Sequence, residues 1–442
     1  MLLWRFCYCL LLVLFFNLVL LASFMPFAVS VLVGFLLIAF YIFFNILPCR
    51  AKDANARLKI LRGGNELIFA SLFSSTAEFV FYIVVLVAKI PFSTAILITN
   101  AVVSALLIFL MHINGLIRLF VFSSQLGLLR RILLLFLWWV PIVNIILLYQ
   151  FVSISGTEYQ FTLEKSKLNT DRKSEKLCQT KYPLLMVHGV FFRDWKIKNY
   201  WGRIPNELTA NGATIYYGEH QSAASVEKSG EELKNTILKI VEETGCEKVN
   251  IIAHSKGGLD ARNAISCHGM DKYTASLTTI ATPHRGCNHV RILTEKISQN
   301  ALASIGKKYE ALYKKLGDDS PDFFGGLEVL TDTECERLNA LMPDSPDVHY
   351  QSVGSKMRSA GGAIFPLNLG YELIKRLGGG DNDGLVSVSS MAWGNFLGII
   401  SPKGSWGISH GDTIDLTGKN IDGFDVCEFY VDLVHNLKLK GF

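Results

Sequence analysis

The first 152 residues of the chain are almost continuously apolar, whereas residues 153–442 have the mixed composition of an ordinary globular protein. About 20 consecutive apolar residues are needed to cross the hydrocarbon core of a bilayer. Runs that approach this length cover 6–24, 27–47, 67–88, 94–112 and 132–152. We therefore expect an all-α transmembrane bundle of about five helices over residues 1–152, with a weak boundary between the first two near Ser23–Pro26. The recurrence of apolar runs excludes a signal peptide alone, which carries one short apolar core.

Basic residues between the runs predict the orientation of these helices, because Lys and Arg gather on the cytoplasmic side of short loops. Residues 48–66 and 113–131 are rich in them, whereas the turn 89–93 carries a single lysine. If 132–152 then crosses outward, everything after it is extracytoplasmic. We expect a multi-pass protein of the cell membrane with an extracytoplasmic C-terminal domain. The net charge of +5 is too small to indicate a nucleic-acid partner.

Polar residues interrupt and then end the apolar half. Glu78 lies inside the third run, where an ionisable group is costly. We interpret it as a neutral or internally paired group at a helix contact, with a polar path or partner site as the alternative. Pro141 should kink the fifth helix, which neighbouring helices can tolerate. Residues 153–181 are charged and lack periodicity, which predicts a linker or stalk.

Residues 182–442 alternate short apolar runs with amphipathic stretches, which predicts an α/β fold with a mostly parallel sheet and flanking helices. A long stretch, 290–325, has helical amphipathic spacing and is expected to form a mobile lid, or else a fixed pair of surface helices, inside an insert of about 290–375. Strands are expected at 183–189, 213–218, 248–253 and 275–283, and helices at 204–212, 227–245, 259–265 and 426–439.

None of the nine cysteines belongs to a CxxC pair, which argues against a zinc ribbon or a redox motif. The six cysteines between 178 and 427 would permit disulfides in an extracytoplasmic domain. Buried free thiols are an equally good interpretation.

The stretch Ala253-His254-Ser255-Lys256-Gly257 fits a nucleophile elbow, with Ala at the usual first glycine. In this motif a sharp turn between strand and helix lifts a serine hydroxyl above the sheet, and small flanking residues prevent clashes. The predicted strand before it and helix after it supply the required context. Ser255 is therefore the candidate nucleophile.

A serine nucleophile needs a base and an acid, which follow it in chain order in this architecture. Among the late histidines, His410 lies in the glycine-rich loop GISHGDT, whereas His435 lies in an apparent helix and His349 precedes the acid candidates. His410 is thus the favoured base. Asp381 and Asp383, in GGGDNDGLVS, are both candidates for the carboxylate that orients it.

Taken in order, these motifs resemble the true-lipase group of bacterial triacylglycerol lipases, within the α/β-hydrolase superfamily. The resemblance covers about 180–435 and matches poorly over 290–375. It implies Ser255 as nucleophile, Asp383 as acid and His410 as base, with oxyanion-hole amides at Val190 and Lys256. The motifs that carry it are YPLLMVHGV, NGATIYY, KVNIIAHSKGGLDAR, LTTIATPHRG, DNDGLVSVSS and SHGD.

The chain also departs from that group. Its secreted members have no N-terminal transmembrane region. Many bind calcium through an Asp matched by Asp412 and a second acid upstream of the catalytic one, but residues 358–370 contain no acidic residue. We therefore expect no metal and no cofactor. His188 is expected to support the oxyanion loop, and the Lys256 side chain to be solvated.

The sequence thus predicts a membrane-anchored serine hydrolase, a lipase or esterase that cleaves carboxylic esters of lipids through an acyl-enzyme. Its domains are a transmembrane region (1–152), a linker (153–181) and a lipase-like α/β-hydrolase domain (182–442). An acyltransferase that uses an alcohol acceptor is the alternative. A non-catalytic membrane scaffold is disfavoured by the complete set of Ser, Asp and His.

Overall fold

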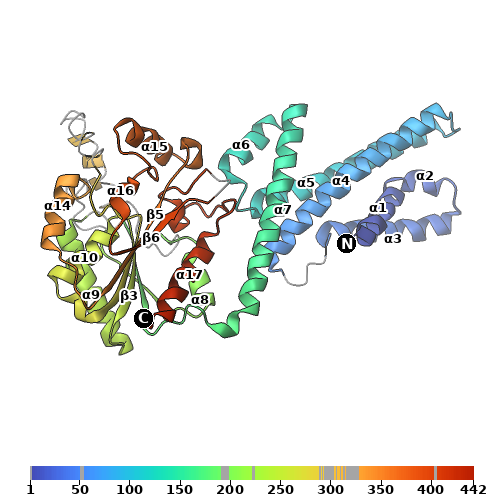
Figure 1. Cartoon of the computed structure of the whole chain (residues 1–442). Helices are drawn as coiled ribbons and strands as arrows, with labels where there is room; N and C mark the ends of the chain where they lie inside the picture. The colour runs from blue at the N-terminus through green and yellow to red at the C-terminus, as the bar shows by residue number, and fades with distance from the viewer. Residues whose placement is uncertain are drawn as a thin grey trace. The chain divides into compact units, whose positions relative to one another are not determined.

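The computed structural model describes residues 2–49, 54–190, 199–221, 224–287, 328–402 and 406–442, together with scattered positions between 290 and 314. The chain divides into two compact units, Met1–Leu168 and Asn169–Phe442 (Figure 1). We call them the helical unit and the α/β unit. The predicted lid at 290–325 lies almost wholly outside the described residues.

The described part of the helical unit contains three helices that are long and apolar enough to cross a membrane, namely α3, α4 and α5. The apolar helix α1 is shorter. The expected fifth span is divided, because α6 ends at Leu137 and α7 starts at Pro141. Proline has no N–H and suits the first turn of a helix, so Pro141 begins a helix rather than kinking one. The bounds are α1 Leu2–Phe16, α2 Leu18–Ala22, α3 Phe27–Ile46, α4 Ala56–Val87, α5 Thr94–Phe122, α6 Gly127–Leu137 and α7 Pro141–Asp171.

The basic residues expected in loops lie largely within helices. Arg57 and Arg62 belong to the first turns of α4, and Arg118 belongs to α5. Helix α4 has 32 residues, so at 1.5 Å per residue it is about 48 Å long, more than the roughly 30 Å of a bilayer core. Its basic first turns can therefore lie beyond the hydrocarbon.

Helices α4 and α5 pack closely through small residues. A Cβ atom added to Gly64 would lie 3.1 Å from the carbonyl oxygen of Gly115, and one added to Gly115 would lie 3.1 Å from that of Gly64. Such close contacts are typical of helix pairs in membranes. Glu78 of α4 is buried and accepts a hydrogen bond from Asn17 Nδ2 at 2.7 Å, which confirms its interpretation as an internally paired group.

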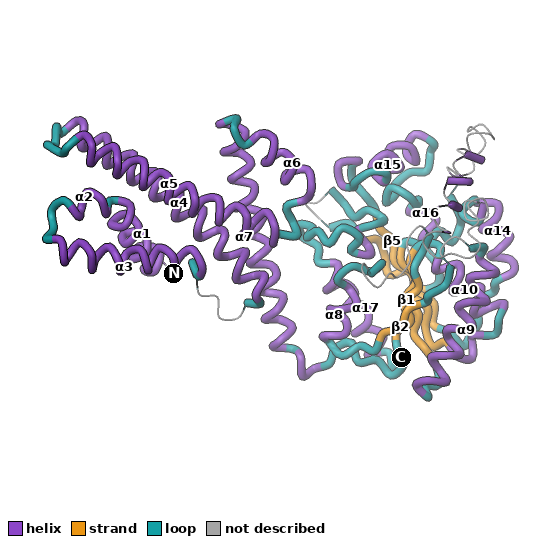
Figure 2. The backbone as a smooth tube through the Cα atoms, turned by 180° about the vertical axis from the view of Figure 1, so that it is seen from behind, coloured by secondary structure: helices purple, strands orange, loops and turns teal. Residues whose placement is uncertain are grey.

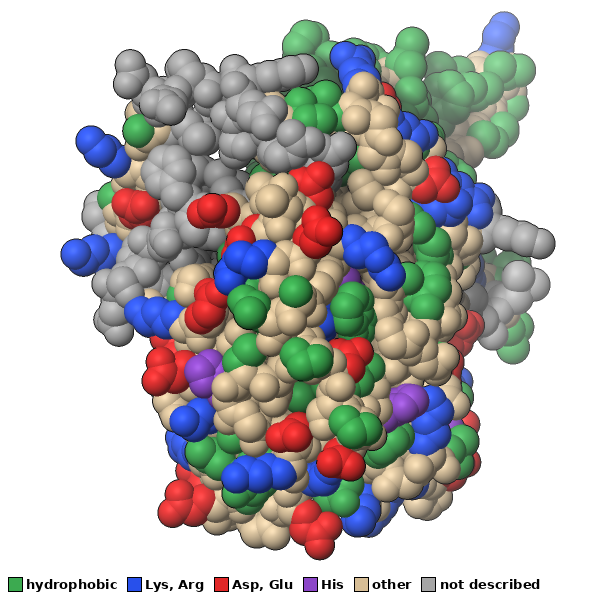
Figure 3. Space-filling view, turned by 60° about the vertical axis from the view of Figure 1, so that its left-hand side comes forward, with side chains coloured by type: hydrophobic (Ala, Val, Ile, Leu, Met, Phe, Trp, Pro, Cys, Tyr) green, Lys and Arg blue, Asp and Glu red, His purple; other side chains and the backbone are tan. Residues whose placement is uncertain are grey.

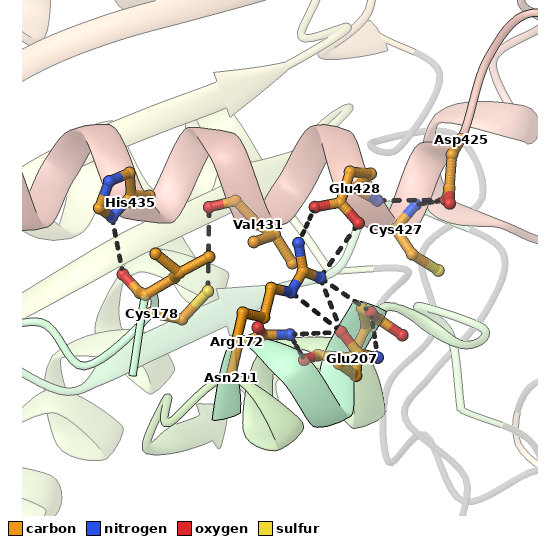
Figure 4. A network of polar contacts seen from close by, with 11 residues as sticks. Arg172, Cys178, Glu207, Asn211, Asp425, Cys427, Glu428, Val431 and His435 are labelled. Atoms are coloured by element: carbon orange, nitrogen blue, oxygen red, sulfur yellow. Dashed lines mark hydrogen bonds and ion pairs between the residues drawn. The ribbon is translucent and has the colours of Figure 1, made fainter. Parts of the chain in front are cut away.

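The segment expected to be an irregular linker is helical as far as Asp171, because α7 continues well past the apolar run. Its polar residues gain partners: Glu158 is buried and accepts hydrogen bonds from the hydroxyls of Ser123 and Ser124, at 2.6 and 2.8 Å. Just beyond the helix, Arg172 pairs with Glu428 and Glu207 (Figure 4). Residues 169–181 are therefore part of the α/β unit.

The α/β unit is built on a six-stranded sheet of order β2-β1-β3-β4-β5-β6, in which every pairing is parallel (Figure 2). This confirms the predicted α/β-hydrolase type of fold. The strands are β1 Leu184–Val187, β2 Ile215–Tyr217, β3 Val249–His254, β4 Thr274–Ile280, β5 His349–Ser355 and β6 Asn395–Ile400.

Helices cover both faces of this sheet (Figure 1). Leu184, Met186 and Ile252 point to a core shared with α8 and α17, whereas Leu185 and Ile251 point to a core shared with α9 and α10. This alternation follows from the two-residue period of a strand. The helices are α8 Ile204–Ala210, α9 Val226–Thr244, α10 Gly257–Cys267, α14 Asp332–Leu341, α15 Leu367–Arg376, α16 Val388–Met391 and α17 Val426–Leu439.

The first four strands and the helices expected around them are confirmed. Strands β5 and β6 were not expected, and β5 lies inside the segment assigned to an insert at 290–375. That assignment is wrong for residues 349–355, which form an interior strand of the sheet. All nine cysteines lie among the described residues and are free thiols.

Candidate active site

The predicted elbow joins β3 to α10. Ser255 follows the last residue of β3 and has a φ of 57°, a left-handed conformation that non-glycine residues rarely adopt. The helix begins two residues later, at Gly257. A Cβ atom at Gly257 would lie 2.3 Å from the carbonyl oxygen of His188, so only glycine fits between the elbow and the end of β1.

Ser255 and His410 line one cavity of about 390 Å³. Val190 and Tyr200 also contribute to its wall. The remaining wall is mostly apolar, which suits a hydrocarbon chain. Its apolar residues are Ile364, Phe365, Pro366, Leu367, Leu385, Ile414 and Leu416.

His410 is held by Asp383, a fully buried residue. The Nδ1 atom of His410 lies 2.8 Å from Asp383 Oδ2, and Ser355 donates to the same oxygen at 3.1 Å. The other carboxylate oxygen accepts from the backbone N–H groups of Leu385 and Val386, at 3.0 and 2.8 Å. Asp383 is thus fixed by four donors, one of them the imidazole.

The alternative residues lie elsewhere. The Asp381 side chain is 56% exposed and pairs with Lys356 at 2.8 Å. His349 lies on β5 and stacks on Phe442. His435 lies on α17, with Nδ1 3.1 Å from the carbonyl oxygen of Leu177. None of these three residues lines the cavity that contains Ser255.

The loop after β1 is tied to the elbow by Tyr200, which the sequence did not single out. The N–H of Gly189 donates to the Tyr200 hydroxyl at 3.0 Å, and that hydroxyl lies 2.6 Å from Nδ1 of His254. The ring of His254 lies 4.5 Å from that of His410, centroid to centroid. The only sequence signal was an aromatic pair, Tyr200-Trp201, shortly after the His188-Gly189 turn.

His188 has the supporting position expected of it. Its Nδ1 lies 2.9 Å from the carbonyl oxygen of Gly189, and its Nε2 lies 3.1 Å from that of His220. The two rings of His188 and His220 stack with centroids 4.0 Å apart. His188 therefore supports the loop before Val190 and does not face the cavity.

The expectation of a solvated Lys256 side chain is wrong. Lys256 is 1% exposed, and its ammonium group lies 2.6 Å from Asp260 Oδ1 and 3.2 Å from Ser229 Oγ. Asp260, one helical turn later, provides the counter-charge that makes this burial possible. Burial raises the pKa of Asp260 to about 6, although Lys256 opposes the shift.

Burial also lowers the pKa of two histidines near the site, His254 and His284, well below the usual value of 6.5. For His254 the neighbouring His410 adds to the effect, and for His284 the charges of Arg262 and Arg285 do so. Both rings are therefore neutral at physiological pH.

The calcium ligand implied by the resemblance, Asp412, accepts hydrogen bonds from its own loop. Its Oδ2 lies 3.0 Å from the N–H of Ser409 and 2.6 Å from the hydroxyl of the same residue. Among the described residues, no group of three or more His, Cys, Asp or Glu side chains could hold a metal ion. The residues at this position therefore do not fit a calcium site.

Comparison with known proteins relates this chain to lipases. A family model with the description "Putative serine esterase (DUF676)" matches residues 185–311. A triacylglycerol lipase of Vibrio cholerae is 30% identical over 240 residues, which are 50% of this chain and 76% of the relative. Triacylglycerol lipase 2 of Saccharomyces cerevisiae is 29% identical over 266 residues, 55% of this chain and 74% of the relative.

Among solved structures, a lipase of Staphylococcus hyicus is similar to this chain, with a TM-score of 0.43 and 20% identity. The similarity covers 59% of this chain and 97% of that protein. The identity to the Vibrio cholerae relative extends over three quarters of that enzyme. The chain therefore belongs to the triacylglycerol lipases of the α/β-hydrolase type and is a carboxylic ester hydrolase.

Proposed function

We propose that the protein is a membrane-anchored lipase or esterase in which Ser255 is the nucleophile, His410 the general base and Asp383 the acid. The observation that carries this proposal is the 2.8 Å contact between His410 and Asp383 beside the cavity that Ser255 also lines. A buried carboxylate at Nδ1 keeps the proton on that nitrogen. The Nε2 atom is then free to accept a proton.

In the first half of the reaction, Ser255 Oγ attacks the ester carbonyl while its proton passes to His410 Nε2. The carbonyl oxygen becomes an oxyanion, which the backbone N–H groups of Val190 and Lys256 would stabilise. Collapse of this intermediate breaks the bond to the alcohol, which takes the proton from His410. Water then attacks the acyl-enzyme by the same route and releases the acid.

The cavity and the helical unit both support a lipid ester as the substrate. The apolar wall around Ser255 suits the acyl chain of a lipid ester. In the helical unit, large apolar side chains are exposed on the long helices, among them Phe27 and Phe79. On the face of the α/β unit drawn in Figure 3, acidic and basic side chains are instead interspersed. A bilayer around the helical unit accounts for this contrast.

The test is hydrolysis of a p-nitrophenyl ester series by the full chain in detergent micelles, with Ser255→Ala as the matched variant. Ser255→Ala should lose at least about 10⁴ in turnover, keep its melting temperature and no longer react with a fluorophosphonate probe. Activity within about tenfold of wild type would place the nucleophile elsewhere. Release of acid without an added alcohol separates hydrolysis from acyl transfer.

A further inference from the structure

A chain of buried polar groups runs beneath the elbow, from Lys256 to the loop after β1. Lys256 and Asp260 form an ion pair in which both side chains are 1% exposed. The second oxygen of Asp260 lies 3.4 Å from Nε2 of His220. The His220 ring stacks on His188, which in turn contacts the carbonyl oxygen of Gly189.

This series of buried polar groups reaches, at each of its two ends, a backbone amide that has a proposed role in the oxyanion hole. At one end, Lys256 itself carries the amide that follows Ser255. At the other end, the Gly189 carbonyl belongs to the same planar peptide group as the N–H of Val190. A hydrogen bond that holds the Gly189 oxygen therefore also fixes the direction of the Val190 N–H.

Stability alone is a poor reason for such a cluster. Taking two charges out of water costs several kcal/mol per ion, and a buried ion pair can often be replaced by apolar residues without loss of stability. Lys256 is the N-cap residue of α10, where the positive end of the helix dipole also disfavours a cation. Both arguments point to a role in the site.

We propose that Lys256 and Asp260 are positioning residues, which hold the two oxyanion-hole amides in a fixed mutual orientation through His220 and His188. The proposal rests on the function proposed above, in which Val190 and Lys256 supply those amides. Neither residue lines the cavity that contains Ser255. The Lys256 ammonium anchors the start of α10 to Asp260 and to Ser229 on α9, and the Asp260 carboxylate connects this anchor to His220.

The test uses the full chain and a double variant, Lys256→Met with Asp260→Asn, which removes both charges at nearly constant volume. Removal of one oxyanion donor commonly costs 10²–10³ in kcat, and loosened donors should cost about tenfold or more. We expect this loss in kcat, with KM within about twofold of wild type. The affinity for a trifluoromethyl ketone, which mimics the tetrahedral intermediate, should fall in parallel with kcat/KM.

A matched control is Glu428→Gln, which removes the charge from the partly buried pair with Arg172 in the same unit. It should lower the melting temperature without changing kcat or the inhibitor affinity. Ser229→Ala removes the contact to the Lys256 ammonium, together with a long hydrogen bond of 3.5 Å to the carbonyl oxygen of Gln221. It keeps the test decisive if the double variant does not fold. It should lower kcat by a few fold and weaken the inhibitor equally.

A folded double variant with kcat and inhibitor affinity within twofold of wild type would overturn the proposal. So would an unchanged kcat in Ser229→Ala where the double variant does not fold. A failure of the proposed function itself would be distinguishable, because Ser255→Ala would then retain activity.

Discussion

Asp383→Asn tests the proposed triad with the smallest possible change, because it replaces one carboxylate oxygen by an amide NH₂. The amide oxygen should remain where the backbone N–H groups of Leu385 and Val386 donate to it. The NH₂ group would then face His410 Nδ1, where Oδ2 lies at 2.8 Å in the wild type. Two donors cannot share a hydrogen bond, so the imidazole proton would move to Nε2.

A histidine protonated at Nε2 cannot accept the Ser255 proton, so we expect kcat to fall about 10⁴-fold. This corresponds to a barrier about 5 kcal/mol higher. The matched control is Asp381→Asn. The Asp381 side chain is half exposed and does not line the cavity that contains Ser255, so kcat of this variant should stay within twofold. Its exposed ion pair is worth only about 0–1 kcal/mol of stability.

Both variants should be assayed as full chains in detergent, with kcat and KM from p-nitrophenyl butyrate hydrolysis and the melting temperature from intrinsic fluorescence. Asp383→Asn should lose kcat while it remains folded at the assay temperature. A folded Asp383→Asn with kcat within tenfold of wild type would refute the reasoning. A large loss in Asp381→Asn instead would transfer the acid role to that residue.

Three further measurements test other parts of the structure. Folded His254 and His284 have depressed pKa values, so below pH 6.5 the unfolded state binds protons that the folded state does not. As the pH is lowered, the free energy of unfolding should therefore fall by about 1.4 kcal/mol per pH unit for each histidine. Urea titrations between pH 7.5 and 5 check this, and His284→Gln should flatten the slope by one proton. Excess EDTA should change neither activity nor melting temperature, since the Asp412 carboxylate accepts hydrogen bonds from Ser409. A drop in melting temperature of several degrees that calcium alone restores would establish a metal site. A reporter fused after Ser166 should be extracytoplasmic and one within 50–62 cytoplasmic, and protease that spares the α/β unit in intact cells but destroys it after lysis would reverse this orientation.

The elbow could be predicted because its determinants are local. The apolar strand, the small residues around Ser255 and the helix after it all lie within residues 248–265. Strand β5 could not be found by the same rule, since its sequence, HYQSVGS, is polar. Its buried side chains are satisfied by distant partners, as Gln351 is by Thr278 and Ser352 by the Trp393 carbonyl.

The supporting contacts of the site were also beyond sequence reasoning, for the same physical reason. Lys256 and Asp260 are one helical turn apart, which suggests a pair on any helix. Their burial depends on Ser229 and His220, which precede them by more than 25 residues. Helix α7 is a similar case. Its Glu158 can be buried because the hydroxyls of Ser123 and Ser124 donate hydrogen bonds to it. A charged stretch of sequence therefore forms a packed helix.

The backbone conformation of Ser255 serves the proposed activity but lowers the stability of the folded protein. A left-handed φ of 57° at a non-glycine residue costs about 1–2 kcal/mol, and Ser255→Ala keeps that cost because alanine also has a Cβ atom. Ser255→Gly would remove it along with the hydroxyl. The inactive glycine variant should therefore melt at a higher temperature than both the wild type and the alanine variant, with part of the gain offset by the entropy of glycine in the unfolded chain. The difference in melting temperature between the glycine and alanine variants measures the conformational strain that the fold maintains at the proposed nucleophile.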